Sequence, residues 1–166
     1  IYIHWGVALL IGAAFATIEL REMFEKGSVP REGLKTVHFH LGITILALVL
    51  IRLFVRARTH APAIVPTPAA WQTGLSHLLH AVLYGLMLAM PILGWLTLSA
   101  AGKPLPFGLP ALVEASKDAA SWYKELHHQL GEILYIVIGV HIAAALVHHL
   151  AFKDNTLKRM MPSRGA

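Results

Sequence analysis

The sequence predicts an all-α membrane protein, a bundle of four transmembrane helices, and three observations support this fold class. Hydrophobic residues make up 56% of the 166 residues and charged residues only 14%, whereas a soluble domain carries about 25% charged residues. Four apolar stretches approach or exceed the roughly 20 residues that a helix needs to cross a bilayer. No stretch alternates apolar and polar residues as the strands of a membrane barrel do.

The four expected spans follow one another in a single domain, 1–166. They cover approximately residues 1–18, 37–55, 75–100 and 126–152. Helices are expected because a backbone in lipid must satisfy its own hydrogen bonds. Pro91 lies inside the third span and should kink it, since proline removes a backbone donor. The chain begins at Ile1 within hydrophobic sequence, which favours a trimmed amino terminus over a cleavable signal peptide.

The charges between the spans predict the orientation. The connection from the second to the third span contains Arg52, Arg56 and Arg58 without an acid, and the segment after the fourth span is basic apart from Asp154. The other two connections have nearly balanced charge. By the positive-inside rule, both basic segments lie in the cytoplasm. We therefore expect a multi-pass membrane protein with both termini cytoplasmic.

Composition also limits the partners and cofactors. The net charge of +5 suggests membrane lipid as a partner, because anionic headgroups attract basic residues beside a span. Nucleic acid is not expected, since the basic residues flank spans and form no single patch. Cysteine is absent, which excludes disulfides, iron–sulfur clusters and covalently attached c-type haem. Any haem must therefore be bound without a covalent link to the chain.

The 11 histidines are the most informative residues, because an ionisable side chain inside a span is costly and is a candidate for function. His127 and His141 both lie in the fourth span, 14 residues apart. On a helix they are about 40° apart around the axis and about 21 Å apart along it. This spacing lets one helix provide an axial ligand to each of two stacked b haems.

The outer haem needs a second ligand at the depth of His127. His38 and His40 are the candidates, and only one of them can point inward because they are two residues apart on a helix. The simplest outer pair is His38 with His127. Two axial histidines leave no open position on the iron, which favours electron transfer over oxygen activation.

The inner haem needs a partner for His141. His4 lies fifteen residues before Glu19, about 22 Å from the outer end of its helix, and so matches the depth of His141. The simplest inner pair is therefore His4 with His141. His77 and His80 remain as hydrogen-bond partners of a ligand, as a quinone site or as alternative ligands.

His148 is the first candidate for a quinone site. It follows His141 by seven residues, so the two lie within about 20° on one helix face. Quinone reduction consumes protons, and histidine is the side chain that most readily relays them near neutral pH. Lys153 and Lys158 are weaker candidates. Alternatively, lipid headgroups at the inner interface satisfy both His148 and His149.

Several short motifs along the chain carry a family resemblance. They are Ile3-His4-Trp5, Val37-His38 with Leu41-Gly42-Ile43, Thr73-Gly74-Leu75 with His77 and His80, Pro91-Ile92-Leu93-Gly94, His127, Ile138-Gly139-Val140-His141, and the tail from Lys153-Asp154-Asn155-Thr156-Leu157 to Arg159-Met160-Met161-Pro162. With these motifs, nearly the whole chain resembles the bacterial cytochrome b561 proteins, whose members include the superoxide oxidase. The tail and the histidine spacing of the fourth span are the most specific parts.

The resemblance implies four helices, two b haems and axial ligands at the positions of His4, His38, His127 and His141. It also implies electron traffic between an outer partner and the quinone pool. In relatives of the superoxide oxidase, superoxide would be the donor and ubiquinone the acceptor. His40 beside His38 and His128 beside His127 leave the outer ligands open.

The favoured function, by this resemblance, is thus that of a superoxide:ubiquinone oxidoreductase of the bacterial inner membrane. The cations that could attract superoxide to the outer face are Arg21, Arg31, Lys35, Lys103, Lys117 and Lys124. One alternative is a haem b subunit of a larger oxidoreductase, because likeness of fold does not fix the substrate. A non-redox alternative is a histidine-based metal-ion transporter, although Glu132 is the only acid within a span.

Overall fold

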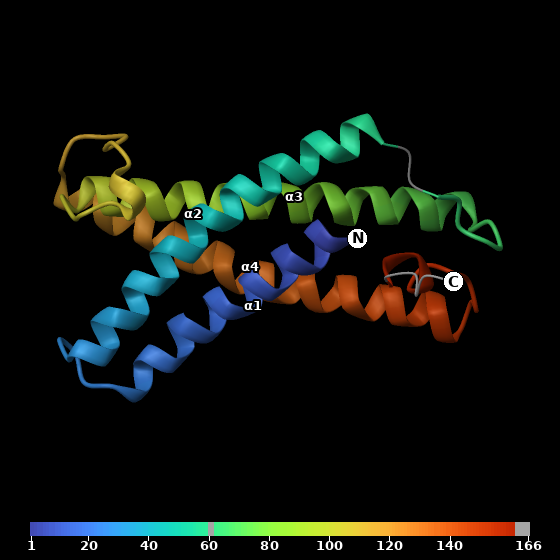
Figure 1. Ribbon diagram of the computed structural model, residues 1–166, viewed down its shortest axis with the longest axis horizontal. Helices are drawn as coiled ribbons and strands as arrows, with labels where there is room; N and C mark the ends of the chain where they lie inside the picture. Colours follow the sequence, from blue (N-terminus) through green and yellow to red (C-terminus); the bar gives the residue numbers. More distant parts are fainter. Residues whose placement is uncertain (60–61, 162–166) are drawn as a thin grey trace.

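Within residues 1–59 and 62–161, four long helices make up most of the molecule (Figure 1). They are α1 (Tyr2–Leu20), α2 (Val29–Arg58), α3 (Ala70–Ala100) and α4 (Lys117–Leu150). The described parts of the connections and the tail contain three short 3₁₀ helices, η1 (Arg21–Met23), η2 (Pro106–Gly108) and η3 (Lys158–Met160). The computed structural model describes residues 1–59 and 62–161. All four long helices are long and apolar enough to cross a membrane, and the predicted all-α, four-span fold is confirmed.

The helices are longer than the apolar spans, chiefly at their amino-terminal ends. α2 begins at Val29 instead of residue 37, and α4 begins at Lys117 instead of residue 126. Pro30 in the first turn of α2 favours a helix start. Ser116 caps α4 by accepting a hydrogen bond from the backbone of Ala119 at 3.3 Å. A polar first turn can therefore be helical outside the hydrocarbon. α3 continues through Pro91 as one helix.

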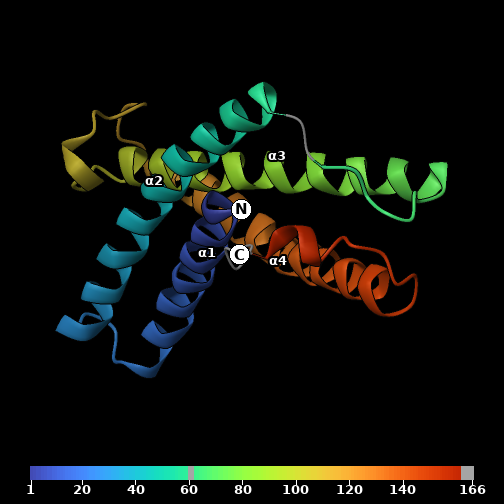
Figure 2. The ribbon, with the colours of Figure 1, turned by 45° about the vertical axis from the view of Figure 1, so that its right-hand side comes forward.

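The helices form two hairpins that cross near the middle of the molecule (Figures 1 and 2). α1 packs against α2, α3 packs against α4, and α2 also packs against α3. Val7 and Ala14 of α1 are buried in one cluster with Ile45 and Val49 of α2. Outside this cluster, large apolar side chains such as Leu9 and Ile136 are 72% and 68% exposed, as expected for a surface that lipid covers.

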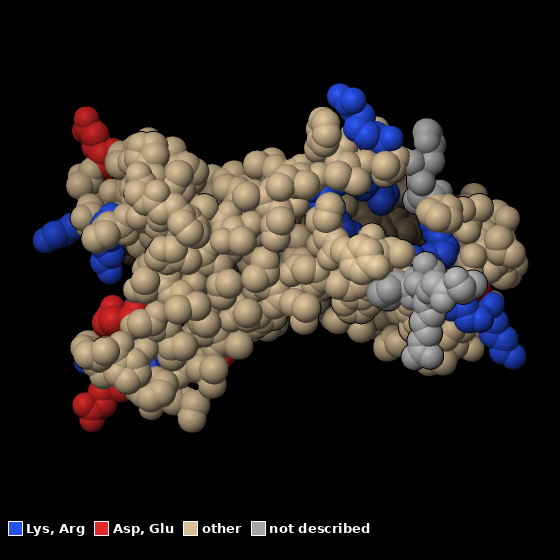
Figure 3. Space-filling model, viewed as in Figure 1, with Lys and Arg blue, Asp and Glu red and all other residues tan. Residues whose placement is uncertain are grey.

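The two ends of the molecule differ in charge (Figure 3). At the basic end, which we define by residues 52–58 and 153–159, the visible charged side chains are mostly Lys and Arg. At the mixed end, defined by residues 21–35 and 101–118, Asp and Glu accompany the basic side chains. The basic segments of the sequence therefore lie at one end of the long axis of the bundle, and the segments of balanced charge lie at the other.

The tail after α4 folds back over the basic end. The backbone N–H of Asn155 donates to Val65 O at 3.1 Å, and the backbone N–H of Val65 donates to Asn155 Oδ1 at 2.9 Å. The indole Nε1 of Trp5 donates to Met160 O at 2.7 Å. These bonds hold the tail against both the α2–α3 connection and the first turn of α1.

Candidate functional site

His38 of α2 and His127 of α4 face each other near the mixed end. Their ring centroids are 6.2 Å apart, and the ring planes are inclined at 82°. His38 lies well inside α2 because that helix begins at Val29. The structure therefore brings together the two side chains that the sequence assigned to the outer pair.

The Nδ1 atoms of this pair are both fixed by backbone carbonyls. His38 Nδ1 donates to Ala14 O at 2.9 Å, and His127 Nδ1 donates to Met90 O at 2.9 Å. A carbonyl oxygen only accepts, so Nδ1 carries the proton in each neutral ring and Nε2 keeps its lone pair. Each imidazole thus offers one nitrogen as a metal ligand while the other fixes its orientation.

The neighbouring histidines turn to other partners. His40 Nδ1 donates to Thr36 O at 2.8 Å, and its ring lies 4.9 Å from that of Phe107 in η2. His128 lies 3.7 Å from Glu132, and its side chain is 69% exposed. Of the two adjacent choices that the sequence left open, only His38 and His127 face each other.

His4 of α1 and His141 of α4 form a second facing pair nearer the basic end. Their ring centroids are 6.3 Å apart at 79°. His80 of α3 also approaches His141, with centroids 5.3 Å apart, and its Nδ1 donates to Ser76 O at 2.6 Å. His77 is exposed. Since His141 follows His127 by 14 residues of one helix, the two pairs are separated by about 21 Å along α4.

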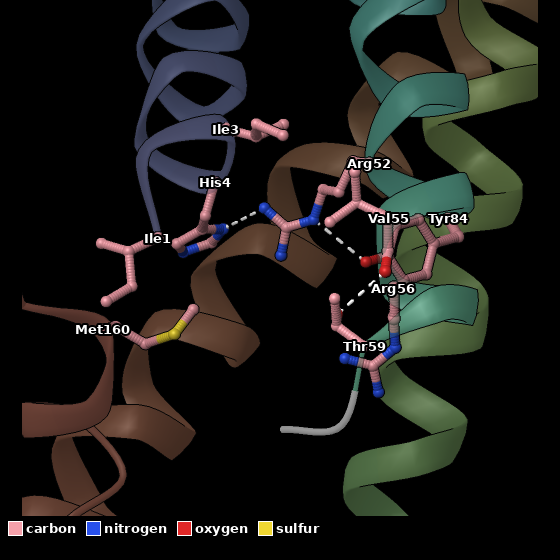
Figure 4. Close-up of a pocket in the computed structure, with 9 residues that line it drawn as sticks. All are labelled: Ile1, Ile3, His4, Arg52, Val55, Arg56, Thr59, Tyr84 and Met160. Carbon is pink, nitrogen blue, oxygen red and sulfur yellow. Dashed lines mark hydrogen bonds between the residues drawn. The ribbon is translucent and has the colours of Figure 1, made fainter. Parts of the chain in front are cut away.

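The charge pattern of the sequence places Arg52 among the loop cations, but its side chain contacts His4 of the inner pair directly (Figure 4). Its Nη1 donates to His4 Nδ1 at 2.6 Å, and its Nε donates to the hydroxyl of Tyr84 at 3.0 Å. The signal that could have found it is its position: α2 places Arg52 within the last turns of an apolar span, where a charge is costly.

His148 has a buried carboxylate as partner. Its Nδ1 lies 2.6 Å from Asp154 Oδ2, and Asp154 is only 4% exposed. Burial alone would raise the pKa of Asp154, but hydrogen bonds from the backbone of Thr156 and from His148 hold that pKa below its usual value. The carboxylate is therefore charged at neutral pH, and it fixes His148 Nδ1–H and leaves Nε2 free. Asp154 was not identified from the sequence as a site residue.

The structure corrects the set of cations available at the mixed end. Arg31 is buried and donates to both carboxylate oxygens of Glu22, at 3.0 and 2.9 Å, and to two backbone carbonyls. Arg21 also pairs with Glu22, and Lys35 pairs with Glu32. The expectation that Arg31 is free to attract an anion is wrong, because it closes the α1–α2 connection. Lys103, Lys117 and Lys124 are exposed.

A site for a metal ion held by side chains alone finds no support. Among residues 1–59 and 62–161, no group of three or more His, Cys, Asp or Glu side chains is arranged to hold a metal ion. The histidines face each other in two pairs, His38 with His127 and His4 with His141. His80 lies beside the second pair without completing a three-ligand group. Each pair supplies two ligands and leaves the others to a bound group. The transporter alternative therefore has no ligand cage in the described part of the chain.

Comparisons with known proteins all indicate similarity to one family. A family model described as prokaryotic cytochrome b561 matches residues 1–163. A protein of Yersinia pestis named probable superoxide oxidase CybB is 42% identical over 165 residues, 98% of this chain and 93% of that protein. Cytochrome b561 homolog 1 of Escherichia coli K12 is 38% identical over 99% of this chain and 95% of its own length, and homolog 2 is 30% identical over 75% and 69%.

Proposed function

Because the chain belongs to the prokaryotic cytochrome b561 family, we propose that it holds two b haems and transfers electrons from superoxide to ubiquinone. As a member of this family, the chain is a multi-pass membrane protein that transfers electrons through haem b. The number of haems, their ligands, the electron donor and the quinone are the proposal.

The main support for two bound haems is the distance between the two imidazole rings within each histidine pair. An imidazole nitrogen binds a metal ion at about 2 Å and lies about 1.1 Å from its ring centre, so two axial imidazoles place their centroids about 6.2 Å apart. The pairs His38–His127 and His4–His141 are 6.2 and 6.3 Å apart. His80 and His141, at 5.3 Å, are too close for an iron between them. The pairs therefore fit the group, with His4 and His141 as inner ligands and His38 and His127 as outer ligands.

The hydrogen bonds of the outer pair support the same assignment. Imidazoles that bind a metal commonly donate their second N–H to a carbonyl or carboxylate, which fixes the ring and raises its basicity. His38 and His127 donate in this way to Ala14 and Met90. When bound, a haem with two axial histidines supplies a one-electron carrier without an open iron position.

The charge difference between the ends supports an orientation in the inner membrane. By the positive-inside rule, the basic end lies in the cytoplasm and the mixed end faces the periplasm. In this orientation both termini are cytoplasmic, His38 and His127 lie on the periplasmic side, and His148 lies on the cytoplasmic side. Electrons then enter beside the outer pair and leave beside the inner pair.

Superoxide is the proposed donor because the Yersinia pestis relative is named a probable superoxide oxidase. Superoxide is an anion, and Lys103, Lys117 and Lys124 can raise its local concentration at the mixed end. Two superoxide ions each lose one electron and leave as O₂. Ubiquinone takes both electrons and two protons and becomes ubiquinol.

His148 is the proposed proton donor for ubiquinone. Asp154 accepts from Nδ1 at 2.6 Å and can stabilise a positive charge on the ring. A proton given up from Nε2 can then be replaced from the cytoplasmic side. The histidine therefore acts as the relay, and Asp154 fixes its orientation.

The first experiment is a dithionite-reduced minus oxidised spectrum of the purified protein, with haem quantified per chain. We expect two protohaems per chain with the α-band of a b cytochrome. The second is anaerobic reduction of a soluble ubiquinone by a superoxide source, measured with and without the protein. A chain with two haems but no such activity would be an electron-transfer cytochrome with another donor. A chain without haem would refute the proposal.

A further inference from the structure

A pocket opens at the basic end between the first turn of α1 and the last turns of α2 (Figure 4). Its volume is about 160 Å³, and its polar lining consists of His4, Arg52, Arg56, Thr59 and Tyr84. Figure 3 shows a hollow at this end with blue side chains around its rim. The pocket therefore lies beside the inner histidine pair and opens to the basic surface.

Among the described residues, the pocket carries positive charge without a matching carboxylate. Its lining from residues 1–59 and 62–161 contains two guanidinium groups and no acidic side chain. Within the described residues, the salt bridges involve neither Arg52 nor Arg56. Arginine remains charged in proteins, and a partly buried guanidinium near a membrane interior is costly unless an anion accompanies it. The pocket thus has the composition of an anion site.

The contact between Arg52 and His4 identifies where the anion belongs. Arg52 donates to His4 Nδ1, so that nitrogen serves here as an acceptor. An imidazole that binds iron through Nε2 carries its hydrogen on Nδ1 and can only donate from it. Ligation by His4 therefore leaves Arg52 Nη1 without its acceptor. The guanidinium must then find a new acceptor within reach of the inner iron site.

We propose that Arg52, together with Arg56 and the hydroxyl of Tyr84, binds the propionate carboxylates of the inner haem. This inference rests on the proposed ligation of that haem by His4 and His141. Protohaem carries two carboxylates on one edge, and the arginine fork matches a carboxylate with two parallel hydrogen bonds. Tyr84 already fixes Arg52 Nε at 3.0 Å and so orients the fork. The inner haem is thereby oriented with its charged edge toward the basic end.

The test compares Arg52→Gln and Tyr84→Phe with Arg58→Gln in the purified full-length protein. Arg58 is a matched control because it is exposed, stacks over Phe54 at 4.9 Å and does not line the pocket. Transfer of each haem to a soluble haem-binding acceptor is followed by absorbance, and each midpoint potential is titrated. We expect Arg52→Gln to speed loss of the inner haem about tenfold or more. The midpoint potential of the inner haem should fall in this variant, because an unpaired carboxylate favours ferric iron.

A second measurement isolates the carboxylates. The protein is produced in cells that cannot make haem and are supplied with either protohaem or its uncharged dimethyl ester. With the ester, wild type and Arg52→Gln should lose the inner haem at equal rates, because no carboxylate remains to be bound. If wild type holds the ester as firmly as protohaem, the proposal is wrong, even where Arg52→Gln fails to fold.

The outcomes separate this inference from the function on which it rests. A wild-type chain with fewer than two haems would refute both. Two haems with equal behaviour of Arg52→Gln and Arg58→Gln would overturn only the propionate site. Loss of bound anionic lipid from Arg52→Gln, counted as phosphorus per chain with both haems unchanged, would show instead that the pocket binds a lipid headgroup phosphate.

Discussion

The ring centroids of His38 and His127 lie 6.2 Å apart, and the two ring planes are inclined at 82°. Each ring donates from Nδ1 to a backbone carbonyl of a different helix. The acceptors belong to Ala14 of α1 and Met90 of α3, so all four helices participate in this one arrangement. Because the carbonyls are part of helical backbone, each ring can turn only by breaking its hydrogen bond to a neighbouring helix. The site is therefore preorganised by the bundle itself.

This arrangement makes the outer ligands testable by neighbouring substitutions. His38→Ala and His127→Ala should each lower the haem content from two per chain to about one, because the iron loses an axial ligand. His40→Ala and His128→Ala should leave two haems, since these rings face Phe107 and Glu132. Haem is quantified per chain in the purified protein. Retention of both haems in His38→Ala would refute the assignment.

Both His4 and His80 approach His141, so substitutions at these two residues test which of them is the second inner ligand. His4→Ala should remove the inner haem, because its centroid distance of 6.3 Å from His141 leaves room for iron. His80→Ala should retain it, because its ring at 5.3 Å is too close to share the metal. Reduced-minus-oxidised spectra and haem content distinguish the two. The reverse result would make His80 the ligand and His4 a neighbour.

The part of the site that the sequence predicts is the part that depends on local helix geometry and not on contacts between distant segments. Helical periodicity and rise along the axis were sufficient to predict which histidines share a depth, and those pairs lie face to face; their ligation of iron stays a prediction. For Arg52 and Asp154, the sequence pattern indicates only charges near span ends. Their contacts depend on how the hairpins cross and how the tail folds back, which no local pattern encodes.

The same reasoning explains the errors at helix ends and in the cation set. Hydropathy marks where a helix enters lipid, so it missed the polar first turns of α2 and α4. Arg31 resembled any loop cation in the sequence. In the structure it is buried because two carbonyls and Glu22 converge on it from the same connection, a role that depends on the turn and not on the charge.

His148 and Asp154 should affect quinone reduction without affecting haem binding. His148→Ala and Asp154→Asn should each slow reduction of ubiquinone about tenfold to hundredfold, within the range for loss of a positioned proton donor. Asp118→Asn is the control, because Asp118 is an exposed carboxylate in the first turn of α4 at the mixed end. Rates are measured beside haem content. Loss of haem from His148→Ala would mean that its role was misassigned.

Asp154 should also make the fold of the tail sensitive to acid. Its pKa is lowered in the folded protein, so its contribution to stability is complete above the ordinary aspartate pKa of about 3.9 and is lost as the pH falls through the lower folded value. Wild type should exceed Asp154→Asn by about 1–2 kcal/mol at neutral pH and converge with it in acid. Thermal unfolding across pH measures this difference. A gap that persists unchanged in acid would contradict it.

The three exposed lysines at the mixed end provide the last prediction. Changing Lys103, Lys117 and Lys124 together to Glu should lower the rate of superoxide oxidation about tenfold at low ionic strength, because an attracting field becomes a repelling one. The effect should shrink as salt rises, since exposed charges are screened beyond about 8 Å at physiological ionic strength. Lys26→Glu, an exposed charge reversal in the α1–α2 connection, is the control for a single charge change elsewhere at the mixed end. Equal rates for the triple variant and Lys26→Glu at low salt would show that these lysines do not guide the anion.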